Sequence, residues 1–165
     1  MKIVIVIDSW TEDNGAVIST KRMVEELTKR GHQITVVTTG EYEGDFYSVP
    51  GFTPFFVRKA LEYTNFRVAI GRKNILRNAF RGADLVQIQF PFLLGRTAVR
   101  IATRMGISVL GACHVQPQNI IAAMGRKESP FIEKMLYFLF NYSLFNHVDA
   151  IHCPSAFAAG MLRDH

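Results

Sequence analysis

The chain has 165 residues, of which 48% are hydrophobic and 20% are charged, and its formal net charge is +5. This balance excludes an intrinsically disordered chain and suits one folded domain with a substantial core. A transmembrane helix is not expected either, because the longest uncharged stretch near the C-terminus, 135–148, is shorter than the ~20 apolar residues of a membrane span.

The first forty residues predict a βαβ unit. A continuous β-branched run at 3–7 is typical of a strand buried on both faces. A helix is expected over 16–30, ended by Gly31, and a second strand over 32–38. The crossover between two such strands is right-handed in nearly all proteins.

The same alternation continues to the end of the chain. It predicts strands at 46–49, 65–70, 84–90, 107–113 and 149–153, and helices at 52–63, 72–81, 93–105, 130–146 and from 154 onward, with a loop or broken helix after 114. Strands that alternate with helices indicate an α/β fold with a Rossmann-like, doubly wound parallel sheet. Because the last helix has barely begun where the chain ends, we expect a fragment cut at a domain boundary.

Polar residues follow several predicted strands, and the carboxyl edge of an open α/β sheet is where ligands bind. The cluster at 8–15 ends in Gly15, which would let a phosphate or sugar approach a helix N-terminus, although a plain turn glycine explains it equally well. Gln87 and Gln89 could bind hydroxyl groups, but an interpretation as solvated strand-end side chains is slightly favoured.

His114 directly follows a predicted strand, so its side chain should emerge at the same edge. A lone histidine is more often structural, yet this position directs it toward the ligand crevice. No paired carboxylates or Ser/His/Asp spacing accompany it, so no hydrolase is predicted, and neither a dinucleotide fingerprint nor a P-loop is present. Cys113 and Cys153 lack metal-ligand spacing and are expected to be free thiols in a reducing compartment, although they could approach each other.

Basic residues gather between 52 and 82, interleaved with phenylalanines. Such segments can lie on anionic lipid, whereas a solvated basic face over core aromatics accounts for the same pattern equally well. We expect membrane contact and a lipid acceptor rather than nucleic acid, for which there is no motif. The residues assigned to the membrane and acceptor side are Arg58, Lys59, Arg72, Lys73 and Arg77.

The helix at 131–145 is apolar on too many sides to face a single core. Another domain, a second copy of the chain or lipid must cover the remainder. We favour a missing C-terminal domain or a homodimer formed through this helix.

An ordered set of short motifs resembles the N-terminal domain of the GT-B fold glycosyltransferases of family 4, the group 1 retaining transferases. The matching pieces are 2–7 followed by 14–16, 27–37, 83–86, 106–114 and 148–155. Together they cover nearly the whole chain. The string 114–117 (HVQP) resembles the bacterial members that glycosylate diacylglycerol and related lipids.

This resemblance implies transfer of a sugar from a nucleotide sugar, often a UDP-sugar, with retained anomeric configuration. It places Asn14, Gly15 and Ala16 against the donor, Gln89 on the donor or acceptor side, and His114 beside the transferred sugar as the catalytic residue. Two departures are notable. The usual glycine pair is Asn14 with Gly15 here, and the histidine that is usual near the end of the strand at 84–90 is Gln87 or Gln89.

The resemblance further implies no metal or other cofactor, and a cytoplasmic enzyme that is peripheral to the membrane. Residues 1–165 would form the acceptor-side domain, whereas the donor-binding domain with its paired glutamates is absent from this chain, which should be inactive alone. A non-catalytic nucleotide- or sugar-binding module and a basic membrane-interaction domain stay open as alternatives.

Overall fold

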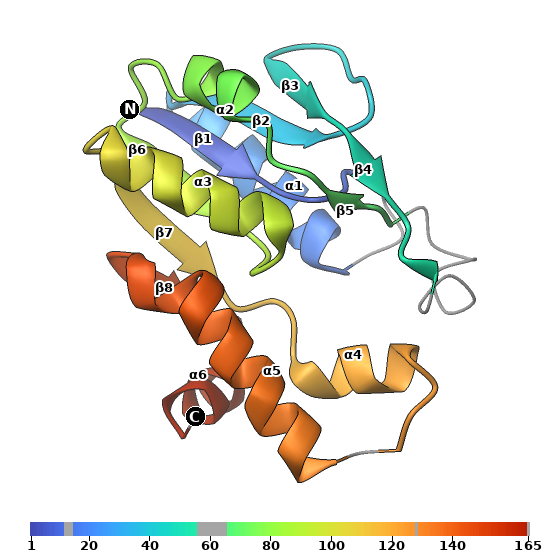
Figure 1. Cartoon of the computed structure of the whole chain (residues 1–165). Coiled ribbons are helices and arrows are strands. Elements are labelled where there is room, and N and C mark those ends of the chain that lie inside the picture. Colours follow the sequence, from blue (N-terminus) through green and yellow to red (C-terminus); the bar gives the residue numbers. More distant parts are fainter. Residues whose placement is uncertain (12–14, 56–65, 128, 165) are drawn as a thin grey trace.

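A computed structural model describes residues 1–11, 15–55, 66–127 and 129–164 of the chain. Figure 1 shows a twisted sheet with helices on both faces and further helical segments beyond the carboxyl end of the central strands. The elements in chain order are β1 (Lys2–Val6), α1 (Gly15–Lys29), β2 (Gln33–Thr39), β3 (Phe46–Val49), β4 (Gly51–Phe52), β5 (Val68–Ala69), α2 (Lys73–Ala79), β6 (Leu85–Ile88), α3 (Leu93–Arg104), β7 (Ser108–Ala112), α4 (Pro117–Ala123), α5 (Pro130–Ser143), the 3-10 turn η2 (Phe145–His147), β8 (Ala150–His152) and α6 (Ala156–Arg163).

Six of the described strands form one parallel sheet in the order β3-β2-β1-β6-β7-β8. Val4 of β1 pairs with Thr35 of β2 on one side and with Val86 of β6 on the other. The chain therefore winds outward in both directions from β1, which confirms the predicted Rossmann-like fold. The gap between β1 and β6 is the topological switch point, where ligands bind in such sheets.

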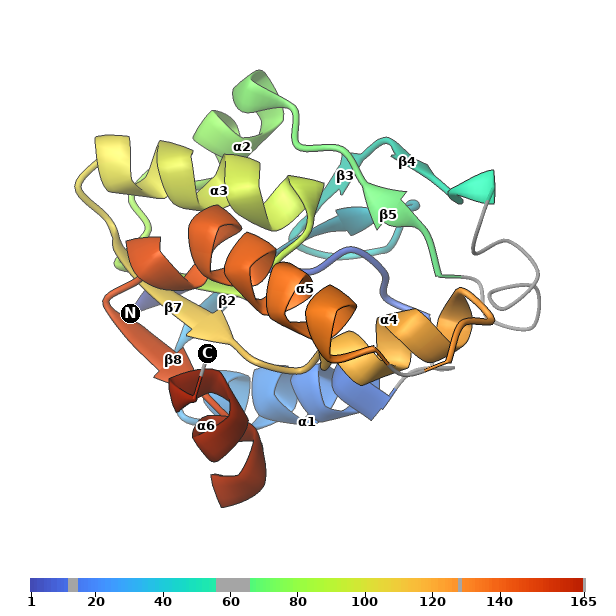
Figure 2. The ribbon, with the colours of Figure 1, turned by 60° about the horizontal axis from the view of Figure 1, so that its bottom comes forward.

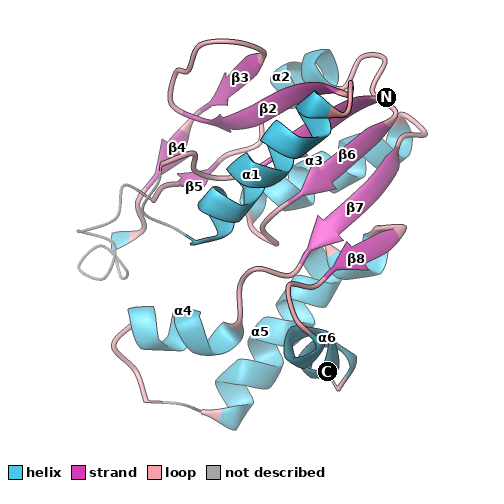
Figure 3. Cartoon of the chain, turned by 180° about the vertical axis from the view of Figure 1, so that it is seen from behind, coloured by secondary structure: helices cyan, strands magenta, loops and turns pink. Residues whose placement is uncertain are grey.

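The two faces of the sheet explain the unbroken apolar run of β1. Ile3 and Ile5 pack with Val17 of α1 on one face, which Figure 3 shows from behind. Val4 and Val6 belong to the larger core cluster on the other face, under α2, α3 and α5. Successive side chains of a strand point to opposite faces, so a strand covered on both faces carries apolar residues throughout.

A glycine in the first turn of α3 sets how closely that helix approaches the sheet. A Cβ added at Gly95 would lie 2.2 Å from the carbonyl oxygen of Phe90 and 2.9 Å from the side chain of Ile88. No other residue fits there. This close approach holds the segment after β6 beneath the start of α3, where part of the candidate site described below is found.

Three predictions about secondary structure need correction. The helix expected over 52–63 does not begin at Phe52, which lies in β4 and pairs with Val68 of β5; residues 56–63 lie outside the described residues. The guanidinium of Arg67 donates to the carbonyl of Gly51 at 2.7 Å, and this hairpin outcompetes local helix propensity. The broken segment after His114 contains α4, and α5 ends at Ser143 rather than at residue 146.

Helix α5 buries Tyr137 and Phe140 but leaves large apolar side chains in solvent. Figure 2 brings α4 and α5 to the front, where they lie across the edge of the sheet. The prediction that this helix cannot bury all its apolar residues in one core is confirmed. Its exposed apolar residues are Phe131, Met135, Phe138, Leu139 and Tyr142. In the described part of the chain, no helix is long and apolar enough to cross a bilayer.

Candidate functional site at the carboxyl edge of the sheet

The candidate site is a band of polar residues that lie one or two positions beyond the ends of β1, β6 and β7. Asp8 follows β1, Gln89 follows β6 and His114 follows β7. Because these strands are parallel neighbours in the sheet, their carboxyl ends lie at one edge. The structure thus brings the predicted residues Gln89 and His114 to the edge expected from the sequence.

Gln89 is fully buried, and neither atom of its side-chain amide has a hydrogen-bond partner among the described residues. Its backbone N–H donates to the carbonyl of Val6 at 2.9 Å, which fixes its position beside β1. An unpaired buried amide costs on the order of 1–3 kcal/mol, so such groups are rare unless they have a function. Gln89 is therefore the strongest pointer to a polar ligand at this edge.

Gln87 is buried as well, and its Nε2 contacts the sulfur of Met23 on α1 at 3.4 Å. The interpretation of Gln87 and Gln89 as solvated strand-end side chains is therefore wrong for both. The reason at Gln87 is that Met23 of α1 lies against its side chain, which sequence spacing alone does not reveal.

His114 is half-buried and lies beside His152, with 6.0 Å between the ring centroids. Burial, and secondarily the neighbouring His152, lowers the pKa of His114 below its usual 6.5. The imidazole is therefore neutral at neutral pH, with one nitrogen that donates and one that accepts a hydrogen bond. Such a group can bind a sugar hydroxyl without adding charge to the site.

Cys113 and Cys153 also meet at this edge, as free thiols. The backbone N–H of Cys113 donates to the carbonyl of His152 at 2.9 Å, which continues the β7–β8 pairing. Burial, together with the neighbouring Cys153 thiol, raises the pKa of Cys113 to about 11. This thiol is therefore protonated and a poor nucleophile.

Asp8 begins the polar cluster predicted at 8–15, but no role of its own was predicted for it. It is buried, and its Oδ1 accepts the backbone N–H of Ala69 in β5 at 2.9 Å. Burial raises its pKa from 3.8 to about 7, and the Ala69 hydrogen bond only partly offsets that rise. A charged residue directly after a buried strand is the sequence signal that could have identified it.

The donor-side residues at the start of α1 are only partly described. Gly15 begins α1 and is exposed, and no atom lies within 4 Å of a Cβ added there. Ala16 follows it, and its carbonyl accepts the hydroxyl of Thr20 at 2.7 Å. Asn14 lies outside the described residues. The open space around Gly15 leaves room for a ligand at this helix N-terminus but does not by itself identify one.

A large apolar cleft adjoins the polar edge. Its volume is about 610 Å³, and it lies between the β4–β5 hairpin, the start of α3, and helices α4 and α5. Phe90 and Val115, which directly follow Gln89 and His114, form part of its wall. Ser143 of α5 donates to the carbonyl of Pro91 at 3.0 Å and ties α5 to the segment after β6. The polar edge and the apolar cleft are thus neighbours.

The predicted membrane and acceptor residues are not brought to this edge as a group. Arg72, Lys73 and Arg77 are exposed on or beside α2, which packs on α3 and on β2 and β3. Arg58 and Lys59 lie outside the described residues. Phe80, which the sequence placed among the interleaved aromatics, is fully buried in the main core.

No three His, Cys, Asp or Glu side chains gather closely enough to hold a metal ion within residues 1–11, 15–55, 66–127 and 129–164. The described residues at the edge offer hydrogen bonding by a buried amide, a neutral imidazole and a carboxyl group whose pKa is near 7.

Solved structures show the same fold. A UDP-N-acetylglucosamine 2-epimerase of Methanocaldococcus jannaschii has a TM-score of 0.56 at 12% identity and matches 99% of this chain and 42% of its own. A second protein with that name has a TM-score of 0.57 at 17% identity, and the match covers 99% of this chain and 44% of that protein. A Listeria monocytogenes protein described as a candidate for the same enzyme has a TM-score of 0.58 at 15% identity, and the match covers 99% of this chain and 41% of that protein.

The chain therefore spans about two fifths of the length of these structural relatives. No curated protein matches it. The model of the family described as Glycosyltransferase Family 4 matches residues 13–165, which include Gln89, His114 and the helix α5. Since this match covers nearly the whole chain, the chain belongs to glycosyltransferase family 4.

Proposed function

We propose that this chain is the acceptor-side domain of a retaining glycosyltransferase that transfers a sugar from a nucleotide sugar. The observation that carries the proposal is the fully buried, unpaired amide of Gln89 at the carboxyl edge, in a chain of glycosyltransferase family 4. A sugar hydroxyl would supply the hydrogen bonds that this amide lacks. His114 would act beside it as a neutral imidazole on the transferred sugar.

The donor is proposed to be a UDP-sugar, with its diphosphate near Gly15 and Ala16 at the N-terminus of α1. Helix N-termini offer unpaired backbone N–H groups and a partial positive charge to phosphates. The structural relatives are named for an enzyme of a UDP-linked sugar, which supports this donor class. No metal or other cofactor is included in the proposal.

A second, donor-binding domain is proposed to complete the enzyme. Its support is the length of the structural relatives, of which this chain matches 41–44%. Half of the donor site would then lie outside this chain, and the chain alone would bind the donor weakly and would not turn over. Alternatively, a homodimer formed through α5 would bury the exposed apolar face of that helix.

The acceptor is proposed to be a lipid, with reversible contact between this domain and an anionic membrane. Support comes from the exposed cations Arg72, Lys73 and Arg77 and from the exposed apolar side chains of α5. Co-sedimentation with vesicles tests the contact. Preferential binding to anionic vesicles supports it, whereas equal binding to neutral and anionic vesicles, or no binding, contradicts it.

A transfer assay on the intact gene product, with a panel of nucleotide sugars and with lipid and soluble acceptors, tests the proposed function. Transfer with a product anomer of unchanged configuration supports a retaining transferase. Inverted configuration contradicts retention. Tight binding of a nucleotide sugar without any transfer would instead identify a non-catalytic sugar-binding module.

A further inference from the structure

The apolar cleft beside the candidate site contains an arginine, Arg96. Its wall is lined by aromatic and aliphatic side chains such as Phe66, Phe90, Phe92, Ile120 and Leu139. Among the described residues that line it, only Arg96 carries a charge. A cleft of this size that is apolar apart from one fixed polar group is typical of a site for an amphiphilic small molecule.

The guanidinium of Arg96 is positioned but not neutralised. It lies over the ring of Tyr142 on α5, with 5.3 Å between its central carbon and the ring centroid. Its Nε is buried without a hydrogen-bond partner, and no ion pair with a described residue compensates its charge. A half-buried guanidinium with an unpaired Nε–H is suited to a phosphate, which the planar fork of an arginine can bind through two hydrogen bonds.

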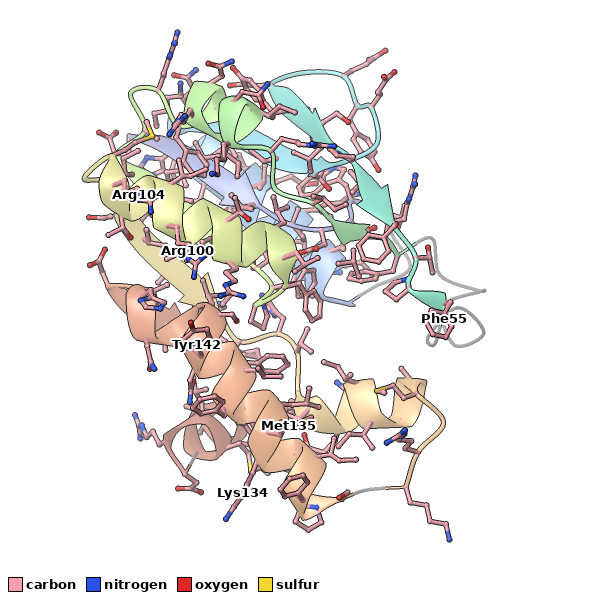
Figure 4. The ribbon with its side chains drawn as sticks, viewed as in Figure 1. Phe55, Arg100, Arg104, Lys134, Met135 and Tyr142 are labelled. Carbon is pink, nitrogen blue, oxygen red and sulfur yellow. The ribbon has the colours of Figure 1, made fainter. Side chains whose placement is uncertain are left out.

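Positive charge continues along α3 from this point. Arg96, Arg100 and Arg104 recur at intervals of four residues and therefore lie on one side of the helix. Figure 4 shows Arg100 and Arg104 on α3 facing the side on which Tyr142 of α5 lies. Of these three arginines, Arg96 alone is among the described residues that line the cleft, and the other two extend positive charge along α3 away from it.

The mouth of the cleft opens along α5, where apolar side chains remain in solvent. Leu139 and Tyr142 line the cleft and are still 45% and 52% exposed. Figure 4 also labels Met135 and Lys134 one to two turns earlier on the same helix. Exposed apolar side chains beside a row of cations complement a molecule with a hydrocarbon chain and an anionic group.

We propose that this cleft binds the hydrocarbon chain of a phosphate-bearing lipid, with Arg96 bound to the phosphate. The inference rests on the proposed transferase function and names the class of its acceptor. The chain would lie between α4, α5 and the β4–β5 hairpin. Because Phe90 and Val115 directly follow Gln89 and His114, the cleft would lead the head group toward the polar edge.

Calorimetric titration of the 165-residue chain tests this site without a donor or a transfer step. The probes are decyl phosphate, kept below its critical micelle concentration, decanol and inorganic phosphate. We expect one decyl phosphate per chain, at least tenfold weaker binding of decanol, and no binding of inorganic phosphate in the same concentration range, because both the chain and the charge contribute.

Matched variants separate the two contributions. Arg96→Gln should weaken the binding of decyl phosphate about tenfold or more and leave the binding of decanol unchanged. Leu139→Glu should abolish the binding of both probes, because it places a carboxylate on the apolar wall. Phe157→Glu is the control, since Phe157 is 66% exposed on α6 and does not line the cleft. Circular dichroism checks that each variant is folded.

Equal affinity for decyl phosphate and decanol, or an Arg96→Gln variant that binds decyl phosphate as the wild type does, would overturn the proposal. So would a wild-type dimer in sedimentation that Leu139→Glu dissociates, because a second copy would then cover the cleft. If decyl phosphate does not bind while the intact gene product glycosylates a soluble acceptor, the lipid site fails and the transferase function stands. If decyl phosphate binds the chain as expected while the intact gene product transfers no sugar to any acceptor, the lipid site stands and the transferase function fails.

Discussion

The carboxyl group of Asp8 accepts the backbone N–H of Ala69 at 2.9 Å, and this hydrogen bond joins the end of β1 to the β4–β5 hairpin across 61 residues of sequence. The hydroxyl of Thr39 donates to the carbonyl of the same Asp8 at 2.9 Å. One residue thereby fixes the hairpin over the carboxyl ends of two central strands. The hairpin forms one wall of the apolar cleft, so the cleft depends on this contact.

Replacing Asp8 by Asn should make stability less dependent on pH. Burial raises the pKa of Asp8 from 3.8 to about 7, so the folded state favours the protonated form. The wild type therefore loses stability as pH rises from about 4 to about 7, by at most about 1.4 kcal/mol per pH unit, and loses no more above pH 7. Asp8→Asn lacks this loss. Urea unfolding at pH 4 to 8 should show the difference between variant and wild type growing up to pH 7.

Asp149 offers a control for that experiment, because its carboxylate also accepts a backbone N–H, that of Val109 at 2.8 Å, but is exposed. Asp149→Asn should not reproduce the Asp8 profile. A flat difference between Asp8→Asn and the wild type across this range would contradict a buried, protonated carboxyl at residue 8.

Two glycines in helices should respond in opposite directions to alanine. At Gly95 of α3 the added methyl group meets the Phe90 carbonyl, so Gly95→Ala should reduce the free energy of unfolding by about 1–3 kcal/mol. At Gly160 of α6 it meets nothing within 4 Å, so Gly160→Ala should raise the free energy of unfolding by about 0.5–1 kcal/mol through helix propensity. Denaturant unfolding measures both, and destabilisation of equal size in the two would refute the close approach of α3.

Replacing Phe80 tests whether the phenylalanines of the basic segment 52–82 serve the core or a membrane surface. It is fully buried, so Phe80→Ala should cost about 3–5 kcal/mol of stability. Phe131, 78% exposed on α5, is the matched control, and Phe131→Ala should cost less than about 0.5 kcal/mol. A small loss of stability in Phe80→Ala, measured by thermal or urea unfolding, would contradict the burial of this side chain in the core.

His114→Ala should lower the transfer rate of the intact gene product by about 100-fold or more, which is typical for loss of a positioned catalytic group. Stability should change little, since the ring is only half-buried. His32→Ala is the control, because His32 precedes β2 and its Nδ1 lies 3.4 Å from the chain's N-terminal amine, at the opposite edge of the sheet. An undiminished transfer rate in His114→Ala would remove the catalytic assignment.

The local sequence pattern was sufficient to predict the main strands and helices, because the residues that favour each of them lie within that element or next to it. The β-branched run of β1, the apolar positions of α1 and the glycines after helices each act within a few residues. The pattern was insufficient at Phe52, where the β4–β5 pairing overrides helix propensity. It also misjudged Gln87 and left open whether Phe80 belongs to the core, because exposure depends on which distant element covers a residue.

The sequence by itself determined the order of strands and helices, and through it the edge at which Gln89 and His114 appear. Parallel strands end at one edge whatever their packing, so residues that follow them are placed by topology. Only the tertiary structure decided that Gln89 is buried without a side-chain partner among the described residues, that Asp8 accepts the N–H of Ala69, and that Arg96 lies over the Tyr142 ring in an apolar cleft. Each of these depends on segments far apart in the chain, and burial and electrostatic environment arise only when those segments pack together.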